Sequence, residues 1–277
     1  MILSYVSTKG GVGTSTLASY NAHYLAREGK KVLYISMSEQ GGVYDVFGCR
    51  SVSEISDNVK LEFLIEKFNE GLSKYDKLKL IQKHIKSIRV NIDVVQVKRI
   101  FNLELKTVNN PITKQKVKEL IAYLESLYDY IVIDYPKIIY SSLFELLDAS
   151  SIIIYVLGLD PLEETSFEHF KQVLLNNNRD MYSNIFIVPN KWESKNETHE
   201  YNLWKVKQDV LRDVDLRWKI TILNAIEKFD LLQDIQLVGL SIYDENILSY
   251  PNMSEVKLKK ITDSINQLYK KINVITK

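Results

Sequence analysis

The chain has 277 residues, 45% of them hydrophobic, and its 36 basic and 35 acidic side chains leave a formal net charge of +1. This composition supports a well-buried core, excludes the disordered class and gives no whole-chain attraction to nucleic acid or to an anionic membrane. The one cysteine, Cys49, excludes an internal disulfide and a site with several cysteine ligands, and the four histidines show no metal-ligand spacing.

No apolar run approaches the ~20 residues that a membrane-spanning helix needs. A glycine-rich segment at residues 8–16 follows Met1 so closely that it leaves no room for a signal peptide. We therefore expect a cytoplasmic protein.

The chain alternates short β-branched and aromatic runs with longer stretches of helical periodicity, which is typical of βα units in a mostly parallel sheet. The first third predicts a strand at residues 2–6, a helix from about residue 15 that stops at Gly29, and a strand at 31–35. A turn-rich connection follows over residues 36–48. Apolar positions between residues 59 and 84 are spaced by three and four, which predicts a helix broken near Gly71.

The rest of the chain continues the same pattern. Strands are predicted at residues 92–97, 128–136, 151–156, 185–189 and 220–222, and helices at 111–124, 164–176, 201–240 and 254–272. No internal repeat and no linker rich in Pro, Gly or Ser is present. We therefore expect one α/β domain over residues 1–277, with a mostly parallel central sheet and helices on both faces.

Residues 8–16 read TKGGVGTST directly after the first predicted strand. A glycine-rich turn between a strand and a helix directs backbone N–H groups and the positive end of the helix dipole at a bound anion. The phosphate-loop pattern is G-x-x-x-x-G-K-[ST]. Here Thr8 holds the first position, Gly13 the second glycine and Ser15 the magnesium hydroxyl, but Thr14 stands where lysine is expected.

Asp134 ends a buried strand at the carboxyl edge of the predicted sheet, where ligands bind in open α/β folds. In phosphate-loop proteins such an aspartate orders Mg²⁺, usually through water, while the loop hydroxyl binds the ion directly. Ser15 and Asp134 are therefore the predicted metal residues. The residues of this loop predicted to bind a nucleotide are Gly10, Gly11, Val12, Gly13, Thr14, Ser15 and Thr16. A tight turn is the alternative explanation for the glycines alone.

These residues resemble the deviant Walker A motif K-G-G-x-G-K-[ST] of the ParA/MinD family of ATPases. Residues 128–136 resemble its Walker B segment, and residues 31–35 stand where its Walker A′ strand lies. The resemblance implies a P-loop fold that binds ATP and Mg²⁺ and forms a nucleotide-sandwich homodimer, in which Lys9 reaches the partner's phosphates as a catalytic residue. It also implies that Asn190 and Lys191 lie at the adenine, although asparagine after a strand is a common turn residue.

Three departures from this family bear on hydrolysis. The family's second strand ends D-x-D, whereas Ser36 and Ser38 occupy those positions, and serine does not hold a water by charge or accept a proton as a carboxylate does. Thr14 lacks the lysine charge that stabilises the transition state, a loss that typically costs several kcal/mol. We therefore expect slow or absent hydrolysis, with Glu39 the nearest replacement carboxylate, one position out of register.

Three functions remain open. Residues 10–16 with 38–40 resemble the TadZ/CpaE-like proteins of tight-adherence pilus systems, which predicts a localisation scaffold for a pilus or secretion apparatus at the cell pole or inner membrane face. The alternative is an active ParA-type partition ATPase that binds DNA or a centromere-binding partner, with Lys9 and Glu39 replacing the missing groups. A third function is a constitutive interaction module with a decayed site.

Two basic stretches leave further partners open. The predicted helix at residues 254–272 is basic and amphipathic, which fits either peripheral membrane contact or a helix that covers the sheet with its lysines in water. The lysine-rich residues 74–86 fit either non-specific DNA binding or a solvated helix face.

Overall fold

The computed structural model describes residues 1–37, 61–68, 71–97, 111–135, 147, 149–158, 170, 185–190, 197, 201, 208 and 220–222. The chain divides into two compact units. The first comprises Met1–Ser7 and Thr14–Ile154, and the second comprises Thr8–Gly13 and Tyr155–Lys277. The organisation of residues 1–277 as one domain stays a prediction.

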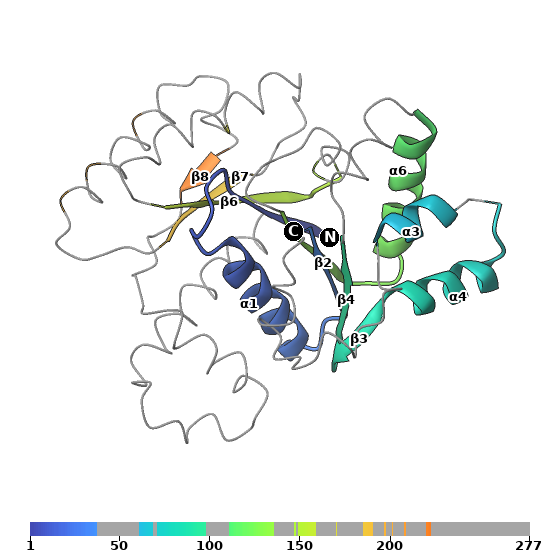
Figure 1. The fold of residues 1–277 in the computed structure, drawn as a ribbon. Coiled ribbons are helices and arrows are strands. Elements are labelled where there is room, and N and C mark those ends of the chain that lie inside the picture. Colours follow the sequence, from blue (N-terminus) through green and yellow to red (C-terminus); the bar gives the residue numbers. More distant parts are fainter. Residues whose placement is uncertain are drawn as a thin grey trace. The chain divides into compact units, whose positions relative to one another are not determined.

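Figure 1 shows the helices and strands of the described residues in their order along the chain. The first unit contains β1 (Ile2–Val6), α1 (Thr14–Arg27), β2 (Val32–Ser36), α3 (Leu61–Lys67), α4 (Lys74–His84), β3 (Lys86–Arg89), β4 (Ile92–Gln96), α6 (Pro111–Glu125) and β5 (Tyr130–Asp134). β6 (Ile152–Leu157) contributes residues to both units, and the second unit also contains β7 (Ile185–Pro189) and β8 (Ile220–Ile222). The strand order is β3-β4-β2-β5-β1-β6-β7-β8.

The centre of the first unit is parallel sheet. β5 pairs in parallel with β1 and with β2, and β2 pairs in parallel with β4. All residues of β1, β2 and β5 are buried, as expected for parallel strands covered on both faces. The register places Asp134 opposite Tyr5 of β1 and Ser36 of β2, so the end of β5 lies between the ends of its two neighbours.

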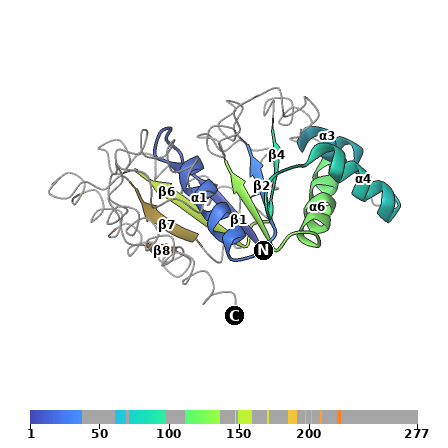
Figure 2. The same ribbon diagram turned by 90° about the horizontal axis from the view of Figure 1, so that it is seen from below.

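Helices cover both sides of these strands. Figure 2 shows α1 on one side of β2, β4 and β5 and the group of α3, α4 and α6 on the other. This arrangement confirms the predicted α/β fold with a mostly parallel sheet. The break expected near Gly71 is also confirmed, because α3 ends at Lys67 and α4 begins at Lys74 after the N-cap Ser73, whose Oγ accepts a hydrogen bond from the Asp76 N–H.

The antiparallel strand β3 was not predicted. It follows α4 directly and pairs with β4 across a turn in which Asn91 has a positive φ of 63°. Three of its four residues, Lys86, Ser87 and Arg89, are polar, so the strand carries little of the apolar alternation by which strands are recognised. The short strand at residues 220–222 is confirmed as β8. The predicted helices at 164–176, 201–240 and 254–272 lie largely outside the described residues.

The stop of α1 at Gly29 is confirmed in detail. Gly29 has φ = +77°, its N–H bonds to the Ala26 carbonyl at 3.0 Å, and the Lys30 N–H bonds to the Leu25 carbonyl at 3.0 Å. This pair of bonds is the Schellman motif, which satisfies the last carbonyls of a helix and favours glycine at the left-handed position.

Gly29→Ala should lower the free energy of unfolding by about 1 kcal/mol, because an L side chain is strained at this φ. A Cβ at residue 29 meets nothing within 4 Å, so no clash adds to the backbone effect. Gly29→Asn is the matched control, since asparagine tolerates the left-handed region better. Urea denaturation of the three proteins measures the difference. An alanine variant as stable as the parent would contradict this description of the helix end.

Candidate functional site

The segment between β1 and α1 contains two residues whose backbone favours glycine. Gly11 has φ = +78° and Gly13 has φ = +95°, both in the left-handed region. Gly10 and Gly11 are exposed, whereas Val12 is buried. The predicted glycine-rich loop is therefore an ordered turn with exposed backbone, and the chain runs from it directly into α1.

In the second unit, two buried side chains hold the first part of this loop. The hydroxyl of Tyr155, on β6, lies 2.8 Å from the hydroxyl of Thr8, and the Tyr155 ring stacks on Phe170 with centroids 4.4 Å apart. Asn190, directly after β7, donates a hydrogen bond from Nδ2 to the Val12 carbonyl oxygen at 2.7 Å. The segment Thr8–Gly13 is thus attached near both of its ends.

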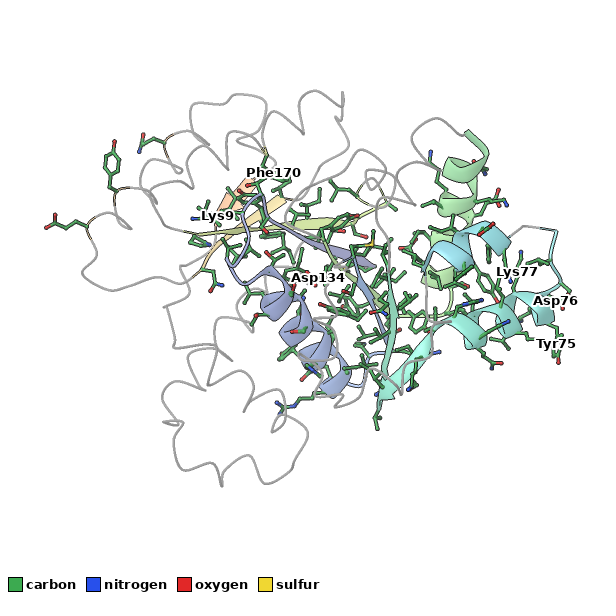
Figure 3. All side chains as sticks on the ribbon, viewed as in Figure 1. Lys9, Tyr75, Asp76, Lys77, Asp134 and Phe170 are labelled. Carbon is green, nitrogen blue, oxygen red and sulfur yellow. The ribbon has the colours of Figure 1, made fainter. Side chains whose placement is uncertain are left out.

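Lys9 lies on this loop and is half-buried (Figure 3). The family resemblance assigns its ammonium group to the phosphates of a partner subunit. This role involves a second chain and stays a prediction.

In the first unit, Thr14 opens α1 with a hydroxyl directed at Ser7. Thr14 Oγ1 donates a hydrogen bond to Ser7 Oγ at 2.8 Å, and both residues are buried. Because this proton is already donated to Ser7, the hydroxyl does not replace the lysine ammonium that the phosphate-loop pattern expects at this position. Ser15 and Thr16, the next two residues of the motif, are half-buried.

Asp134, at the end of β5, is the buried carboxyl group of the first unit's site (Figure 3). The Tyr34 hydroxyl donates to its Oδ2 at 3.0 Å. Burial raises the pKa of Asp134 from 3.8 to about 6, and hydrogen bonds with the side chains of Ser15 and Tyr34 act in the opposite direction. Its Oδ1 is buried and, within the described part of the chain, has no hydrogen-bond partner.

These features fit the Mg²⁺ that the family resemblance implies. A buried carboxylate oxygen without a partner is costly, and a cation or a cation-bound water would compensate it. Mg²⁺ usually keeps several waters and takes one or two protein oxygens plus substrate phosphates, so a set as small as Ser15 and Asp134 is sufficient. Accordingly, no group of three or more His, Cys, Asp or Glu suited to a metal occurs among the described residues. A side-chain hydrogen bond joins Ser15 and Asp134, and their role as the metal residues stays a prediction.

Ser36 occupies the first position of the family's D-x-D pattern. It is fully buried and lies opposite Asp134 in the register of β2 and β5. Residues opposite each other in paired strands project to the same face, so a carboxylate at position 36 would add a second negative charge beside Asp134. The sequence predictions also name Ser38, Glu39 and Lys191, which lie outside the described residues.

Sequence reasoning missed three side chains that position the loop and Asp134: Ser7, Tyr34 and Tyr155. Each lies in or just after an apolar strand, where it was interpreted as core. A signal was available for the tyrosines, because a tyrosine buried in a central strand needs a partner for its hydroxyl. The sequence does not show which partner it finds.

The lysine-rich residues 74–86 are mostly a solvated helix face. Lys74, Lys79 and Lys83 of α4 are exposed, while Lys77 lies over the rings of Phe68 and Tyr123, 5.4 and 5.8 Å from their centroids. The predicted amphipathic helix at residues 254–272 lies outside the described residues. None of the helices in the described part of the chain combines the length and apolarity that a membrane crossing requires.

Comparison with known proteins finds curated relatives that match most of the chain. The chain is 24% identical over 262 residues to a Rhizobium rhizogenes protein described as replication protein A. The match covers 90% of this chain but 56% of that protein, so the chain spans little more than half the length of this relative.

Solved structures share the fold over nearly the whole chain. A plasmid partition protein from Borrelia burgdorferi B31 bound to AMPPNP has a TM-score of 0.66 at 20% identity and covers 98% of both chains. An ATP complex of a Cyanothece McdA variant has a TM-score of 0.72 at 16% identity and covers 96% of this chain and 95% of that chain. Cobyrinic acid a,c-diamide synthase from Mycobacterium smegmatis, with ADP and magnesium, has a TM-score of 0.64 at 15% identity and covers 86% and 89%.

These likenesses show the predicted P-loop fold. The family model of the AAA domain AAA_31 matches residues 1–176, well over half of the chain. The chain therefore belongs to the AAA_31 family, whose members are ParA/MinD-like P-loop ATPases.

Proposed function

We propose that the protein is a partition-type member of this family that binds ATP with Mg²⁺, forms a homodimer around the nucleotide and hydrolyses ATP slowly. The observation that carries the proposal is the buried Asp134 carboxyl beside Ser15, with Tyr34 on one oxygen and no described partner on the other. When bound, Mg²⁺ would neutralise phosphate charge at this point. Membership of the AAA_31 family and the AMPPNP-bound partition protein support the nucleotide.

Slow hydrolysis is proposed because two groups that assist cleavage are missing from the described site. The Thr14 hydroxyl donates to Ser7 and supplies no positive charge. Ser36 supplies no carboxylate to orient a water. Backbone N–H groups and the dipole of α1 remain available for holding phosphates, so binding does not require the groups that hydrolysis lacks.

A scaffold for a pilus or secretion apparatus is the second candidate. Its support is the resemblance of residues 10–16 with 38–40 to the TadZ/CpaE-like proteins. The partition-type function is preferred because a partition protein shares the fold over 98% of both chains. DNA and a centromere-binding protein are the partners expected for a partition protein, whereas components of a secretion apparatus are expected for a scaffold.

ATP with Mg²⁺ should bind the purified chain with a dissociation constant in the micromolar range, as measured by isothermal titration calorimetry. Binding no tighter than millimolar would remove the nucleotide from the proposal. Fluorescence anisotropy with a duplex of arbitrary sequence then separates the two candidates. ATP-dependent DNA binding supports partition, and an ATP-dependent dimer that ignores DNA supports the scaffold.

The purified chain with ATP and Mg²⁺ also tests the role of Lys9. Sedimentation velocity should show a dimer with Mg-ATP and a monomer without nucleotide, and Lys9→Ala should remain monomeric in both. Lys30→Ala is the control, because Lys30 is an exposed lysine after α1. A Lys9→Ala protein that dimerises as the parent does would contradict the assignment of Lys9 to the partner's phosphates.

Thr14→Lys should tighten ATP binding by about tenfold or more, because a lysine there adds a charge-assisted contact to phosphate. It should not by itself give fast turnover, since positions 36 and 38 still lack carboxylates. Thr14→Met is the control, because it also loses the Ser7 hydrogen bond and has a long side chain without charge. Calorimetry and a phosphate-release assay measure both quantities, and brisk hydrolysis by Thr14→Lys alone would show the account of the missing groups to be wrong.

Asp134→Asn should stabilise the ligand-free protein more at pH 7.5 than at pH 4.5. The pKa of Asp134 is about 6 when folded and near 3.8 when unfolded, so the folded state binds more protons between these values. The protonated Asp134 carboxyl favours the folded state. Its contribution to stability is fully present below pH 3.8 and is lost as the pH rises through 6. Urea denaturation should show that the difference in free energy of unfolding between Asp134→Asn and the parent grows by on the order of 2 kcal/mol from pH 4.5 to 7.5.

Mg-ATP provides the complementary measurement on these two proteins. At pH 7.5 it should raise the stability of the parent but raise that of Asp134→Asn much less, because the amide holds no charge for the ion. A gap between the ligand-free proteins that stays constant from pH 4.5 to 7.5 would contradict the buried, raised-pKa carboxyl.

A further inference from the structure

We propose that Asn190 is a positioning residue for phosphate binding: its side chain fixes the orientation of the Val12–Gly13 peptide and thereby presents the Gly13 N–H to the phosphates of the nucleotide. The family resemblance places this asparagine at the adenine instead. The inference rests on the proposed function, since it concerns how the same loop binds a polyphosphate.

The first support is the direction of the Asn190 amide. Its Nδ2 donates to the Val12 carbonyl oxygen at 2.7 Å, and Asn190 and Val12 are 2% and 4% exposed. A hydrogen bond shielded from water in this way is stronger than one at the surface. One N–H of the side-chain amide is therefore committed to the loop.

The second support is peptide geometry. A trans peptide is planar, so the carbonyl of Val12 and the N–H of Gly13 belong to one rigid plate and point in opposite directions. When Asn190 holds the carbonyl, the N–H is fixed on the side of the plate that faces away from Asn190. A flipped plate would turn a carbonyl oxygen toward the phosphates, which repels an anion instead of binding it.

The third support is the close approach of Asn190 to Gly13. Gly13 has φ = +95°, and a Cβ built on it would collide with Nδ2 of Asn190. Glycine at position 13 therefore serves two purposes, since it adopts the left-handed backbone and leaves the space that the amide occupies.

Asn190 itself is held firmly. Its backbone N–H donates to the Leu157 carbonyl at 2.8 Å, which fixes the residue between the ends of β6 and β7. Near the other end of the segment, the Thr8 hydroxyl meets Tyr155 on β6. The loop segment Thr8–Gly13 therefore takes its conformation from the strand ends of the second unit, and Asn190 is the contact that acts on the peptide whose N–H is to bind phosphate.

The test compares ATP, GTP and inorganic tripolyphosphate as ligands of the full chain. Calorimetry on the parent, Asn190→Ala and Asn190→Asp should show both variants weakening all three ligands by about tenfold. The ratio of ATP to GTP affinity should stay unchanged. Adenine recognition predicts a different result, in which ATP weakens and tripolyphosphate does not, and that result would overturn the proposal.

Other outcomes are equally decisive. If the parent binds neither ATP nor tripolyphosphate, the proposed function fails. If the parent binds both and Asn190→Ala binds them as tightly, the positioning role fails while the function stands. A loss confined to Asn190→Asp would be repulsion of phosphate by a new negative charge, and it would also overturn the positioning role.

A second measurement observes the peptide directly and does not require the variant to bind its ligand tightly. The chain has 10 glycines, so selective ¹⁵N-glycine labelling gives a simple spectrum in which Gly13 is assigned by mutation. Tripolyphosphate should move the Gly13 signal strongly in the parent, and move it much less in Asn190→Ala at the same saturation. An equal shift in both proteins would show that the Gly13 N–H is presented without Asn190.

Discussion

The parallel pairing of β5 with β1 and β2 is the constraint on which the first unit's site depends. It brings Asp134 into register with Tyr5 and Ser36 and leaves the carboxyl buried between the two neighbouring strand ends. A buried carboxyl requires partners, and Tyr34 from β2 and Ser15 from α1 supply two. The remaining oxygen, Oδ1, has no hydrogen-bond partner among the described residues, and a cation there would compensate for its burial.

The loop itself shows how binding and cleavage of a triphosphate separate physically. Backbone N–H groups and a helix dipole can hold phosphate, and a carboxylate can hold a metal ion, without a cationic side chain. Cleavage requires more, because charge that develops in the transition state must meet a cation and a water must be oriented. Thr14 and Ser36 have neutral, buried hydroxyls at positions where cleavage requires charge. The backbone that binding requires is kept. This division explains why the fold of an ATPase does not establish fast turnover.

Much of the described fold was predictable from the sequence because five strands, β1, β2, β5, β6 and β7, are fully buried and the helices have regular apolar spacing. The end of α1 at Gly29 and the break before Ser73 follow from local rules that need no tertiary information. Strand β3 was missed because its pairing with β4, and not its own composition, makes it a strand. Ser15 and Asp134 were predicted from a motif and a strand end, and their metal role stays a prediction. The hydrogen bond from Asn190 to the Val12 carbonyl was not predictable, because a sequence does not show which way a side chain turns.

The central claim is that this chain holds ATP and cleaves it slowly, and a single-turnover experiment tests it most directly. Excess protein is mixed with radiolabelled Mg-ATP, and the protein-bound label is recovered on a filter and separated into ATP and ADP over time. If the chain binds ATP and hydrolyses it slowly, the label is retained and remains ATP over many minutes. Retained label that is ADP within seconds, or no retained label, would contradict it.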